Sequence, residues 1–404
     1  MNSYFGPVKK RPVTALAGVP FACLIAIVSV GSVAAQSQTA QSQTQSAAAA
    51  QAKAAAASKG QTAGEFFKNV TTSTLKGLTP SDFLGAMGVM TAAVGYDCSN
   101  CHPGAGTDNF DWVSDKIPQK KTARRMIEMV ALINRQNFGG AQMVTCWTCH
   151  HGLDLPTTSI ALDKLYGEPN DEKRDVVVAA EGEPPATQIL DQYIQAMGGA
   201  QKLAAVKSFI ATGHSEGYSG LGGNGAFQIF AQAPDRRGMW ITFPDHPDRG
   251  TSAWTYDGKS GWISQPRGFL GEYELNGNDL AGAKLDSVLA FPGQIKTAFP
   301  TWRVGPEDVL NGRDVYVVQG SGTSGMLGTF YFDKQTHLLT RYVRRTPSPV
   351  GRITIQQDFD DYRDVNGIKF PFKYSFLWLD GRFTAIISDV KVNVPVDAAK
   401  FAKP

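Results

Sequence analysis

Two five-residue segments of this 404-residue chain share one pattern and restrict its fold more than any other feature of the sequence. They are Cys98–His102 (CSNCH) and Cys146–His150 (CWTCH), and both read Cys-x-x-Cys-His. The chain has five cysteines, and the fifth, Cys23, lies in an apolar stretch close to the start of the sequence. Every other cysteine therefore belongs to one of the two motifs, and each pair is followed directly by a histidine.

The spacing of the motif has a mechanical reason. Two thiols separated by two residues lie on one side of a helical turn, where they can form thioethers with the two vinyl groups of one haem, and the next imidazole then faces the iron. A redox-active dithiol and half of a zinc site are the alternatives, but neither explains why both pairs precede a histidine. The sequence therefore predicts two covalently bound haem c groups. Their thioether positions are Cys98, Cys101, Cys146 and Cys149, and the proximal iron ligands are His102 and His150.

The ligand on the opposite side of each iron decides between catalysis and electron transfer. An open position permits catalysis or gas binding, whereas methionine closes the iron and raises its potential. A methionine-bearing helix is expected upstream of each motif, with Met87 before the first and Met126 before the second. Methionines on apolar helix faces are usually core residues. Met90 and Met129, one turn further on, are the core candidates if Met87 and Met126 bind iron.

The stretch from Asn69 to Gly152 resembles the cytochrome c subunit of photosynthetic reaction centres. That family has a methionine after an Asp/Glu-Phe-Leu-x-x segment and then Cys-x-x-Cys-His, which appears here as DFLGAM at 82–87 followed by the first motif. Its second unit has Ala-Arg-Arg-Met-x-Glu-Met ahead of the next motif, which appears here as ARRMIEM at 123–129. The resemblance covers about a fifth of the chain.

The resemblance implies that Met87 and Met126 are the sixth iron ligands, and that the chain is an electron-transfer protein rather than an enzyme. Reaction-centre members of the family carry four haems, whereas this chain has motifs for only the first two. The loop Gln136–Thr145 also lacks the histidine with which the family's loop binds another haem. The implied partner is a membrane-bound reaction-centre complex of photosynthesis, although a respiratory partner fits the residues equally well.

Three polar residues near the motifs have two interpretations each. Arg124 and Arg125 precede Met126, and their guanidinium groups are expected either to contact haem propionates or to cover the solvent side of the helix. His151 cannot reach the iron face that His150 occupies, so it is expected at the surface or near a propionate.

The first 63 residues do not predict a folded domain. A basic segment, Lys9–Arg11, precedes an apolar stretch that ends in small residues at 33–35, which is typical of a secretory signal peptide. An apolar stretch of this length is also long enough to remain as a membrane anchor. Residues 36–63 are a low-complexity Ala/Gln/Ser segment and are expected to be a linker. We therefore expect 1–35 to be a signal peptide or anchor, and the protein to be periplasmic.

The remaining chain predicts a multi-domain α+β protein. Residues 64–165 are expected to form a mostly α-helical dihaem cytochrome domain, with one helix from about Thr79 to Gly95 and a second from about Lys121 to Asn137. Residues 166–186 are rich in charge and proline and are expected to be a linker. Residues 187–404 are expected to form an antiparallel β-rich domain.

The β-rich domain is expected to contain one or two helices. The first runs from Thr187 to Met197 and ends at a Gly-Gly pair, and the second lies near Leu280–Phe299. Asp-Gly and Asn-Gly turns separate the β-type runs, and we expect eight or more strands. Tyr331–Lys334 and Asn366–Pro371 loosely resemble segments of the half-barrel of periplasmic lipoprotein-carrier-like domains. That resemblance implies a concave sheet that binds an acyl chain or a partner protein.

Three functions follow from these patterns. The leading hypothesis is an exported dihaem electron carrier between redox partner proteins, and a net charge of +3 gives no reason to expect nucleic acid as a partner. A lipid- or protein-binding carrier with an accessory cytochrome is the first alternative. A haem peroxidase-like enzyme, which would need one open iron position, is the second.

Overall fold

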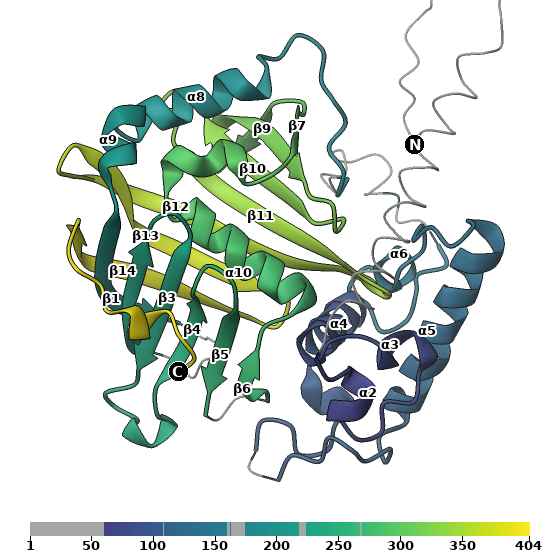
Figure 1. Cartoon of the computed structure of the whole chain (residues 1–404). Coiled ribbons are helices and arrows are strands. Elements are labelled where there is room, and N and C mark those ends of the chain that lie inside the picture. The colour runs from purple at the N-terminus through teal and green to yellow at the C-terminus, as the bar shows by residue number, and fades with distance from the viewer. Residues whose placement is uncertain (1–59, 108, 160–161, 163–173, 218–223, 267–268) are drawn as a thin grey trace, which may run out of the picture. The chain divides into compact units, whose positions relative to one another are not determined.

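The computed structural model describes residues 60–107, 109–159, 162, 174–217, 224–266 and 269–404 (Figure 1). All of these lie within one compact unit, Gln43–Pro404. The expected signal peptide or anchor, nearly all of the 36–63 linker and the first part of the 166–186 linker lie outside the described residues. Within the described ranges, no helix is both long and apolar enough to cross a bilayer.

The part of the chain that contains both motifs is helical. Its elements are α2 (Ala63–Phe66), α3 (Ser73–Lys76), α4 (Pro80–Val94), the 3₁₀-helix η1 (Cys98–Asn100), α5 (Pro118–Asn137) and α6 (Cys146–His150). Helix α4 has the ends that its sequence predicts: the Thr79 hydroxyl oxygen accepts a hydrogen bond from the Asp82 amide at 3.0 Å, and Gly95 closes the helix with a left-handed backbone at φ 68°.

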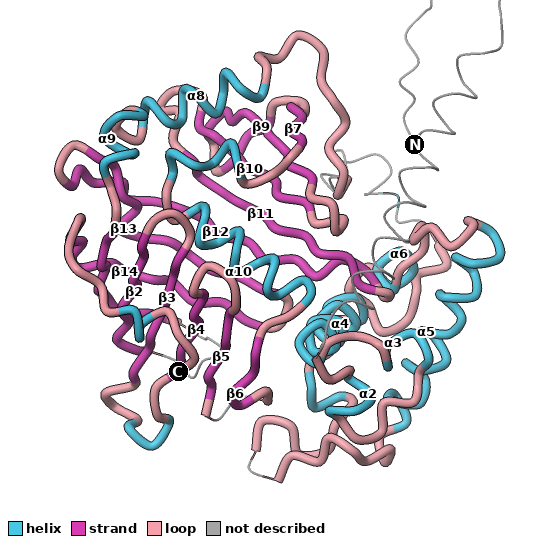
Figure 2. Tube along the Cα trace, in the orientation of Figure 1, coloured by secondary structure: helices cyan, strands magenta, loops and turns pink. Residues whose placement is uncertain are grey.

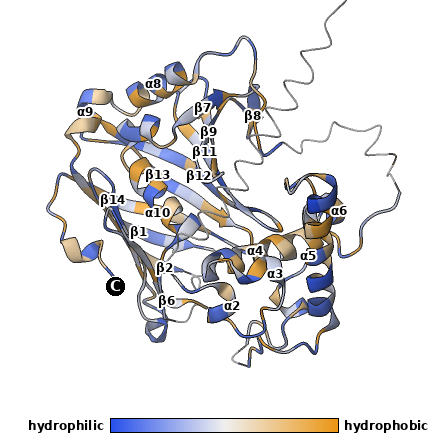
Figure 3. Ribbon diagram, turned by 45° about the vertical axis from the view of Figure 1, so that its right-hand side comes forward, coloured by the Kyte–Doolittle hydropathy of each residue, from blue (hydrophilic) through white to orange (hydrophobic). Residues whose placement is uncertain are grey.

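Helix α5 is amphipathic, as its sequence predicts, and begins three residues earlier than expected because Pro118 is well suited to a first helical position. Ile127, Val130 and Asn134 are buried on one face, and the helix shows both hydrophilic and hydrophobic positions in Figure 3. The Asn134 side chain donates to the Val144 carbonyl oxygen at 2.8 Å and accepts from the Val144 amide at 2.9 Å. These bonds fold the loop after α5 back toward the second motif.

The remainder of the described chain is dominated by strands, which form a single antiparallel sheet (Figure 2). The strands are β1 (Ser208–Glu216), β2 (Gly225–Gln232), β3 (Arg236–Thr242), β4 (Ser252–Tyr256), β5 (Gly261–Gln265), β6 (Gly271–Glu274), β7 (Thr301–Val304), β8 (Asp308–Leu310), β9 (Arg313–Ser321), β10 (Leu327–Asp333), β11 (Leu339–Ser348), β12 (Gly351–Val365), β13 (Ile368–Trp378) and β14 (Gly381–Val392).

The strand order is β6-β5-β4-β3-β2-β1-β14-β13-β12-β11-β10-β9-β7, with β8 paired to β9. Almost every neighbouring pair is a sequential hairpin, and β1 with β14 is the pairing that joins the two ends of the domain. The Asn311-Gly312 and Asn366-Gly367 turns have positive φ at both residues, as the predicted hairpins require. The sequence therefore predicted the sheet type correctly.

The helices of this part differ from the prediction in two ways. The described residues contain α8 (Ala186–Ala196), α9 (Ala200–Ala205) and α10 (Gly277–Leu289), one helix more than expected. Helix α9 has only six residues, which are too few for a helical hydrophobic period to be recognised in the sequence. The helix expected near Leu280–Phe299 ends at Leu289, and the 3₁₀-helix η3 (Pro292–Thr297) follows it, because Pro292 has no amide hydrogen with which to continue an α-helix.

Two apolar cores stabilise the described chain. The larger fills the concave side of the sheet, under α8 and α10, and includes Phe227, Phe330 and Tyr342. The smaller joins Phe83, Ala86 and Val89 of α4 to Ile127 of α5 and to Val350, which lies at the tip of the β11–β12 hairpin. This hairpin extends toward α4 and α6 in Figure 1. The helical part is thus packed on the sheet through a shared core.

The described residues also contain two short 3₁₀-helices, η2 (Pro247–Arg249) and η4 (Ala398–Lys400).

Candidate functional site

The first Cys-x-x-Cys-His motif folds as a tight helical turn. Asp97 precedes η1, and its carboxylate accepts from the Ser99 amide at 2.7 Å while its own amide donates to the Asn100 side-chain oxygen at 2.9 Å. The His102 amide donates to the Cys98 carbonyl oxygen at 2.9 Å. Asp97, together with Ser99 and Asn100 between the cysteines, therefore caps the turn that brings the thiols and the imidazole together.

The His102 ring is oriented by the loop that follows it. Its Nδ1 atom lies 3.2 Å from the carbonyl oxygen of Trp112, which the ammonium group of Lys120 also contacts. Burial, and secondarily the Lys120 charge, lowers the pKa of His102, so the imidazole is neutral near pH 7. A neutral imidazole that donates through Nδ1 leaves Nε2 as a free electron pair for a metal.

The second motif repeats this arrangement on a different loop. Helix α6 is capped by Thr145, whose amide donates to the Thr148 hydroxyl oxygen at 3.0 Å. The Nδ1 atom of His150 lies 2.9 Å from the carbonyl oxygen of Leu153. His151 ends α6 with a left-handed backbone at φ 48°, and its ring lies edge-on to Trp147. His151 therefore turns the chain away from the ring of His150.

The donor atoms fit haem better than a shared zinc ion. The four motif thiols form no disulfide, and no three His, Cys, Asp or Glu side chains in the described ranges are arranged to hold a metal ion. The zinc alternative would require the two motifs to meet at one ion. Each motif instead presents two thiols and one histidine whose free nitrogen is set by its own backbone acceptor, which is the donor set of a haem c site.

The expected methionine ligands lie on the helices that the sequence assigns to them. Met87, half-buried on α4, lines the same cavity as Cys98 and His102. Met126 is half-buried on α5, and α5 contacts α6. Met90 is also half-buried and packs on the smaller core, whereas Met129 is 42% exposed. The structure thus brings Met87 and His102 to one cavity, and it gives Met129 no core role.

The two arginines differ in their surroundings. Arg124 donates to the Asp115 carboxylate at 2.8 Å and to the Asn69 carbonyl oxygen at 3.2 Å, and this contact holds the pKa of Asp115 below its usual range. Arg125 is exposed and donates to the Thr122 hydroxyl oxygen at 3.2 Å. Arg124 therefore braces the loop that orients His102, and a propionate contact remains a prediction for both residues.

Helix α4 connects the two motifs. Its Ala93 carbonyl oxygen accepts from the Gly152 amide at 2.8 Å, just after the second motif. A Cβ atom on Gly95 would lie 2.3 Å from the Gly152 carbonyl oxygen, so only glycine allows this approach. The Cys146 amide also donates to the Val350 carbonyl oxygen at 3.4 Å. The helix that carries Met87 is thus joined to the end of the second motif, and the second motif is joined to the sheet.

Sequence comparison gives the same assignment for this part of the chain. Residues 27–187 match the family model of the photosynthetic reaction centre cytochrome C subunit. The resemblance inferred from the motifs is therefore confirmed.

Two curated relatives carry the same description. The photosynthetic reaction center cytochrome c subunit of Thermochromatium tepidum is 36% identical over 104 residues, which cover 24% of this chain and 24% of that protein. The subunit of Rubrivivax gelatinosus is 34% identical over 103 residues, covering 24% of this chain and 26% of that protein. The chain thus spans about a quarter of the length of the curated relatives that it matches.

Solved structures to which the chain is similar each cover about half of it. A DUF1329 family protein from Desulfovibrio piger covers 55% of this chain and 98% of its own length, at 14% identity and a TM-score of 0.38. A LolA superfamily protein from Nitrosomonas europaea covers 55% of this chain and 99% of its own, at 12% identity and a TM-score of 0.36.

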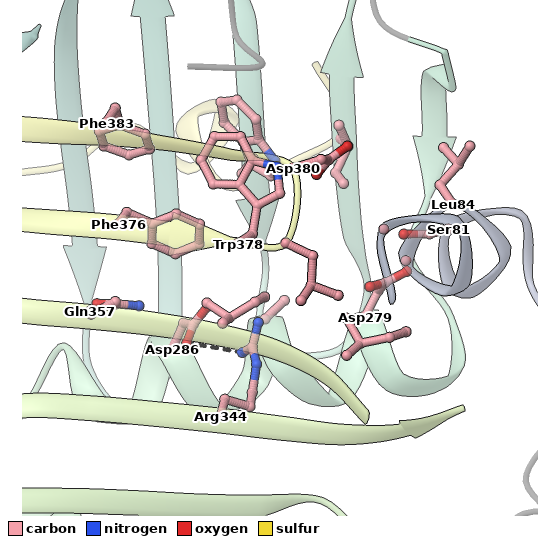
Figure 4. Close-up of a pocket in the computed structure, with 18 of the residues that line it drawn as sticks. Ser81, Leu84, Asp279, Asp286, Arg344, Gln357, Phe376, Trp378, Asp380 and Phe383 are labelled. Atoms are coloured by element: carbon pink, nitrogen blue, oxygen red, sulfur yellow. Dashed lines mark hydrogen bonds and ion pairs between the residues drawn. The ribbon is translucent and has the colours of Figure 1, made fainter. Parts of the chain in front are cut away.

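Several residues of the site carry no signal in the sequence. The acceptors for the two motif histidines are backbone carbonyls, of Trp112 and Leu153, which no residue type reveals. Asp82 was recognisable only as an early residue of α4, yet it is 8% exposed and its carboxylate accepts from Asn278 of α10 at 3.3 Å. Asp279 follows Asn278 and approaches α4 on the same side, near Ser81 in Figure 4. The meeting of α4 and α10 could not be predicted from either segment alone.

Proposed function

We propose that this chain is an exported dihaem c-type cytochrome that transfers electrons between redox partner proteins. The observation that carries the proposal is the repeated geometry of the motifs, in which two cysteines precede a histidine whose Nδ1 atom lies against a backbone carbonyl. The match of residues 27–187 to the reaction centre cytochrome family supports it independently.

The haem groups would be held by this chain's own side chains. Cys98 and Cys101 would form the thioethers of the first haem and Cys146 and Cys149 those of the second, and each haem would supply one-electron redox chemistry. The contacts to Trp112 and Leu153 would fix each imidazole ring, so that little reorganisation accompanies the change of iron charge. Arg124 and Arg125 are proposed as cations that would contact the propionates.

Methionine ligation is the second part of the proposal. Met87 would close the iron opposite His102, and Met126 the iron opposite His150. The position of Met87 on the cavity of the first motif supports the first pair, and the contact of α5 with α6 supports the second. Two closed irons favour electron transfer over peroxide or gas chemistry.

The partner of the chain is proposed by analogy with its relatives. Their descriptions name a subunit of the photosynthetic reaction centre. A membrane-bound electron-transfer complex is therefore the proposed acceptor, and a periplasmic location, with residues 1–35 as signal peptide or anchor, is proposed with it.

One observation favours a second candidate function, the binding of an apolar ligand by the sheet domain. A cavity of about 1440 Å³ lies between the concave face of the sheet, α10 and α4, and most of its lining side chains are apolar. This space is large enough for a small-molecule ligand.

The ligand state of the iron can be tested by the absorption spectrum of the purified protein. Two closed irons predict a low-spin spectrum in both oxidation states and slow, incomplete binding of cyanide by the ferric protein. Rapid stoichiometric binding of cyanide to either iron would instead support the peroxidase-like alternative.

A further inference from the structure

The large cavity is shared by the sheet and the first motif. Cys98, His102 and Met87 line it from the helical part, and the sheet and α10 supply a predominantly apolar wall. Three of these apolar side chains, Phe376, Trp378 and Phe383 of the β13–β14 hairpin, are labelled in Figure 4. A ligand in this cavity would therefore lie beside the first haem site, which an isolated carrier domain would not require.

A small number of polar groups face this apolar space. Asp82 and Asp279 approach each other from α4 and α10, and the Asn278 side chain donates to both oxygens of Asp82 at 3.3 Å. The Oδ2 atom of Asp279 is buried and has no hydrogen-bond partner among the described residues. The hydroxyl group of Thr255, a residue that is 2% exposed and lines the cavity, likewise finds no partner in the described ranges.

Buried polar groups without partners are costly, so these positions are suited to a ligand that supplies hydrogen bonds. The carboxylate and its neighbours are not suited to an anion. Arg344, the buried cation of this wall, is already paired with Asp286 at 3.1 Å, as the dashed line in Figure 4 shows. Asp82 and Asp279 add no positive charge that would attract a fatty-acid carboxylate. A neutral ligand with hydroxyl donors and an apolar body fits this wall better.

We propose that the cavity binds a lipophilic hydroquinone, with its hydroxyl groups toward Asp279 and its ring beside the first motif, and that this hydroquinone is an electron donor to the two haems. The inference rests on the proposed function, because it needs the haems as oxidant. The cavity would thus provide the electron carrier with a binding site for a hydroquinone substrate.

The reaction balances with the groups that the chain would contain. Oxidation of one hydroquinone to the quinone breaks two O–H bonds and releases two electrons and two protons. The two electrons would be accepted one at a time by the two haem groups, which Cys98, Cys101 and His102 and Cys146, Cys149 and His150 would hold. The protons pass to the Asp279 and Asp82 carboxylates and then to water. Burial raises the pKa of both carboxyl groups, with repulsion between them as a further cause for Asp82, so they are effective proton acceptors.

The test uses the purified full-length, haem-loaded protein with decylubiquinone and decylubiquinol as probes. Equilibrium dialysis measures the binding of decylubiquinone, with palmitate as the competing lipid. Stopped-flow absorbance measures haem reduction by decylubiquinol, with dithionite as a reductant that needs no binding site. We expect saturable decylubiquinone binding, no displacement by palmitate, and haem reduction that saturates with decylubiquinol.

Two variants with matched controls locate the site. Ala283 lines the cavity from α10, and A283W should narrow the cavity next to Asp279 and weaken decylubiquinone binding about tenfold or more, whereas K284W on the exposed side of the same helix should not. D279N should keep decylubiquinone binding but slow reduction by decylubiquinol about 100-fold, the scale of lost proton transfer, whereas D389N on the surface should not.

The outcomes separate this inference from the proposed function. A chain without haem would overturn the donor role together with the proposed function. A haem-loaded chain that dithionite reduces, but that does not bind decylubiquinone, would overturn the inference alone. Displacement of the quinone by palmitate, or a D279N variant that decylubiquinol reduces as fast as the unmodified protein, would overturn it too.

Discussion

At the scale of single residues, the two motif histidines have the same local chemistry although their surroundings differ. His102 meets the Trp112 carbonyl oxygen across a loop, and His150 meets the Leu153 carbonyl oxygen within one turn. The motif itself was evident in the sequence, because its residue types are specific. The acceptors were not, because every residue carries a carbonyl group and only the folded loop selects one.

The methionine assignment makes a prediction with internal controls. Met87→Ala and Met126→Ala should each lower one midpoint potential by a sizeable part of the roughly 0.8 V range that axial ligands span, because a methionine sulfur favours ferrous iron. Redox titration measures both potentials. Met90→Ala and Met129→Ala are the matched controls, one turn further along each helix, and should leave the potentials in place. Potentials that respond to the controls instead would reassign the ligands.

The carboxyl group of Asp82 predicts a pH effect on stability. Burial, and then repulsion from Asp279, raises the pKa of Asp82 to about 7, above its unfolded value of 3.8. The folded chain therefore binds more protons than the unfolded chain between these values, and the contribution of Asp82 to stability is full below about pH 4 and falls as the pH rises toward 7. Asp82→Asn should flatten the measured free energy of unfolding across this window. An unchanged slope would show that the carboxyl titrates normally.

At the scale of elements, α4 shows how far local sequence determines structure. Thr79, Pro80 and Gly95 predicted both ends correctly, since caps act within one turn. Its neighbours were not predictable. A Cβ atom added to Gly85 would lie 2.6 Å from Ile353, and one added to Gly88 would lie 3.0 Å from Leu379. Both distances are shorter than ordinary van der Waals contact. Those partners lie far along the sequence, so the glycines acquire a reason only in the folded chain.

The glycine that ends α4, Gly95, gives a specific prediction for stability. Its positive φ and the 2.3 Å approach that a Cβ would make to the Gly152 carbonyl oxygen are both incompatible with a side chain. Gly95→Ala should therefore lower the free energy of unfolding by about 1–3 kcal/mol, as strained backbone positions do. Chemical denaturation measures the change. Gly106→Ala is the control, because it has a similar φ with no neighbour within 4 Å, and it should cost clearly less.

At the scale of the whole molecule, the described residues form a helical part with two redox motifs and a sheet of fourteen strands, and the two parts share the smaller core and one cavity. The sequence predicted each part from its own periodicity, but it treated them as separate domains. Contacts such as Gln142 to the Ser348 carbonyl oxygen at 2.6 Å join residues more than two hundred positions apart, which no local pattern encodes. The proposed link between electron transfer and the cavity rests on these contacts.

The measurement that tests the central claim most directly is the haem content of the exported, purified chain. Intact mass under denaturing conditions, together with a pyridine haemochrome spectrum, should show two haems that remain attached when the protein unfolds, with no free thiol at Cys98, Cys101, Cys146 or Cys149. A colourless protein of unmodified mass, with these four thiols free or joined in disulfides, would contradict the account.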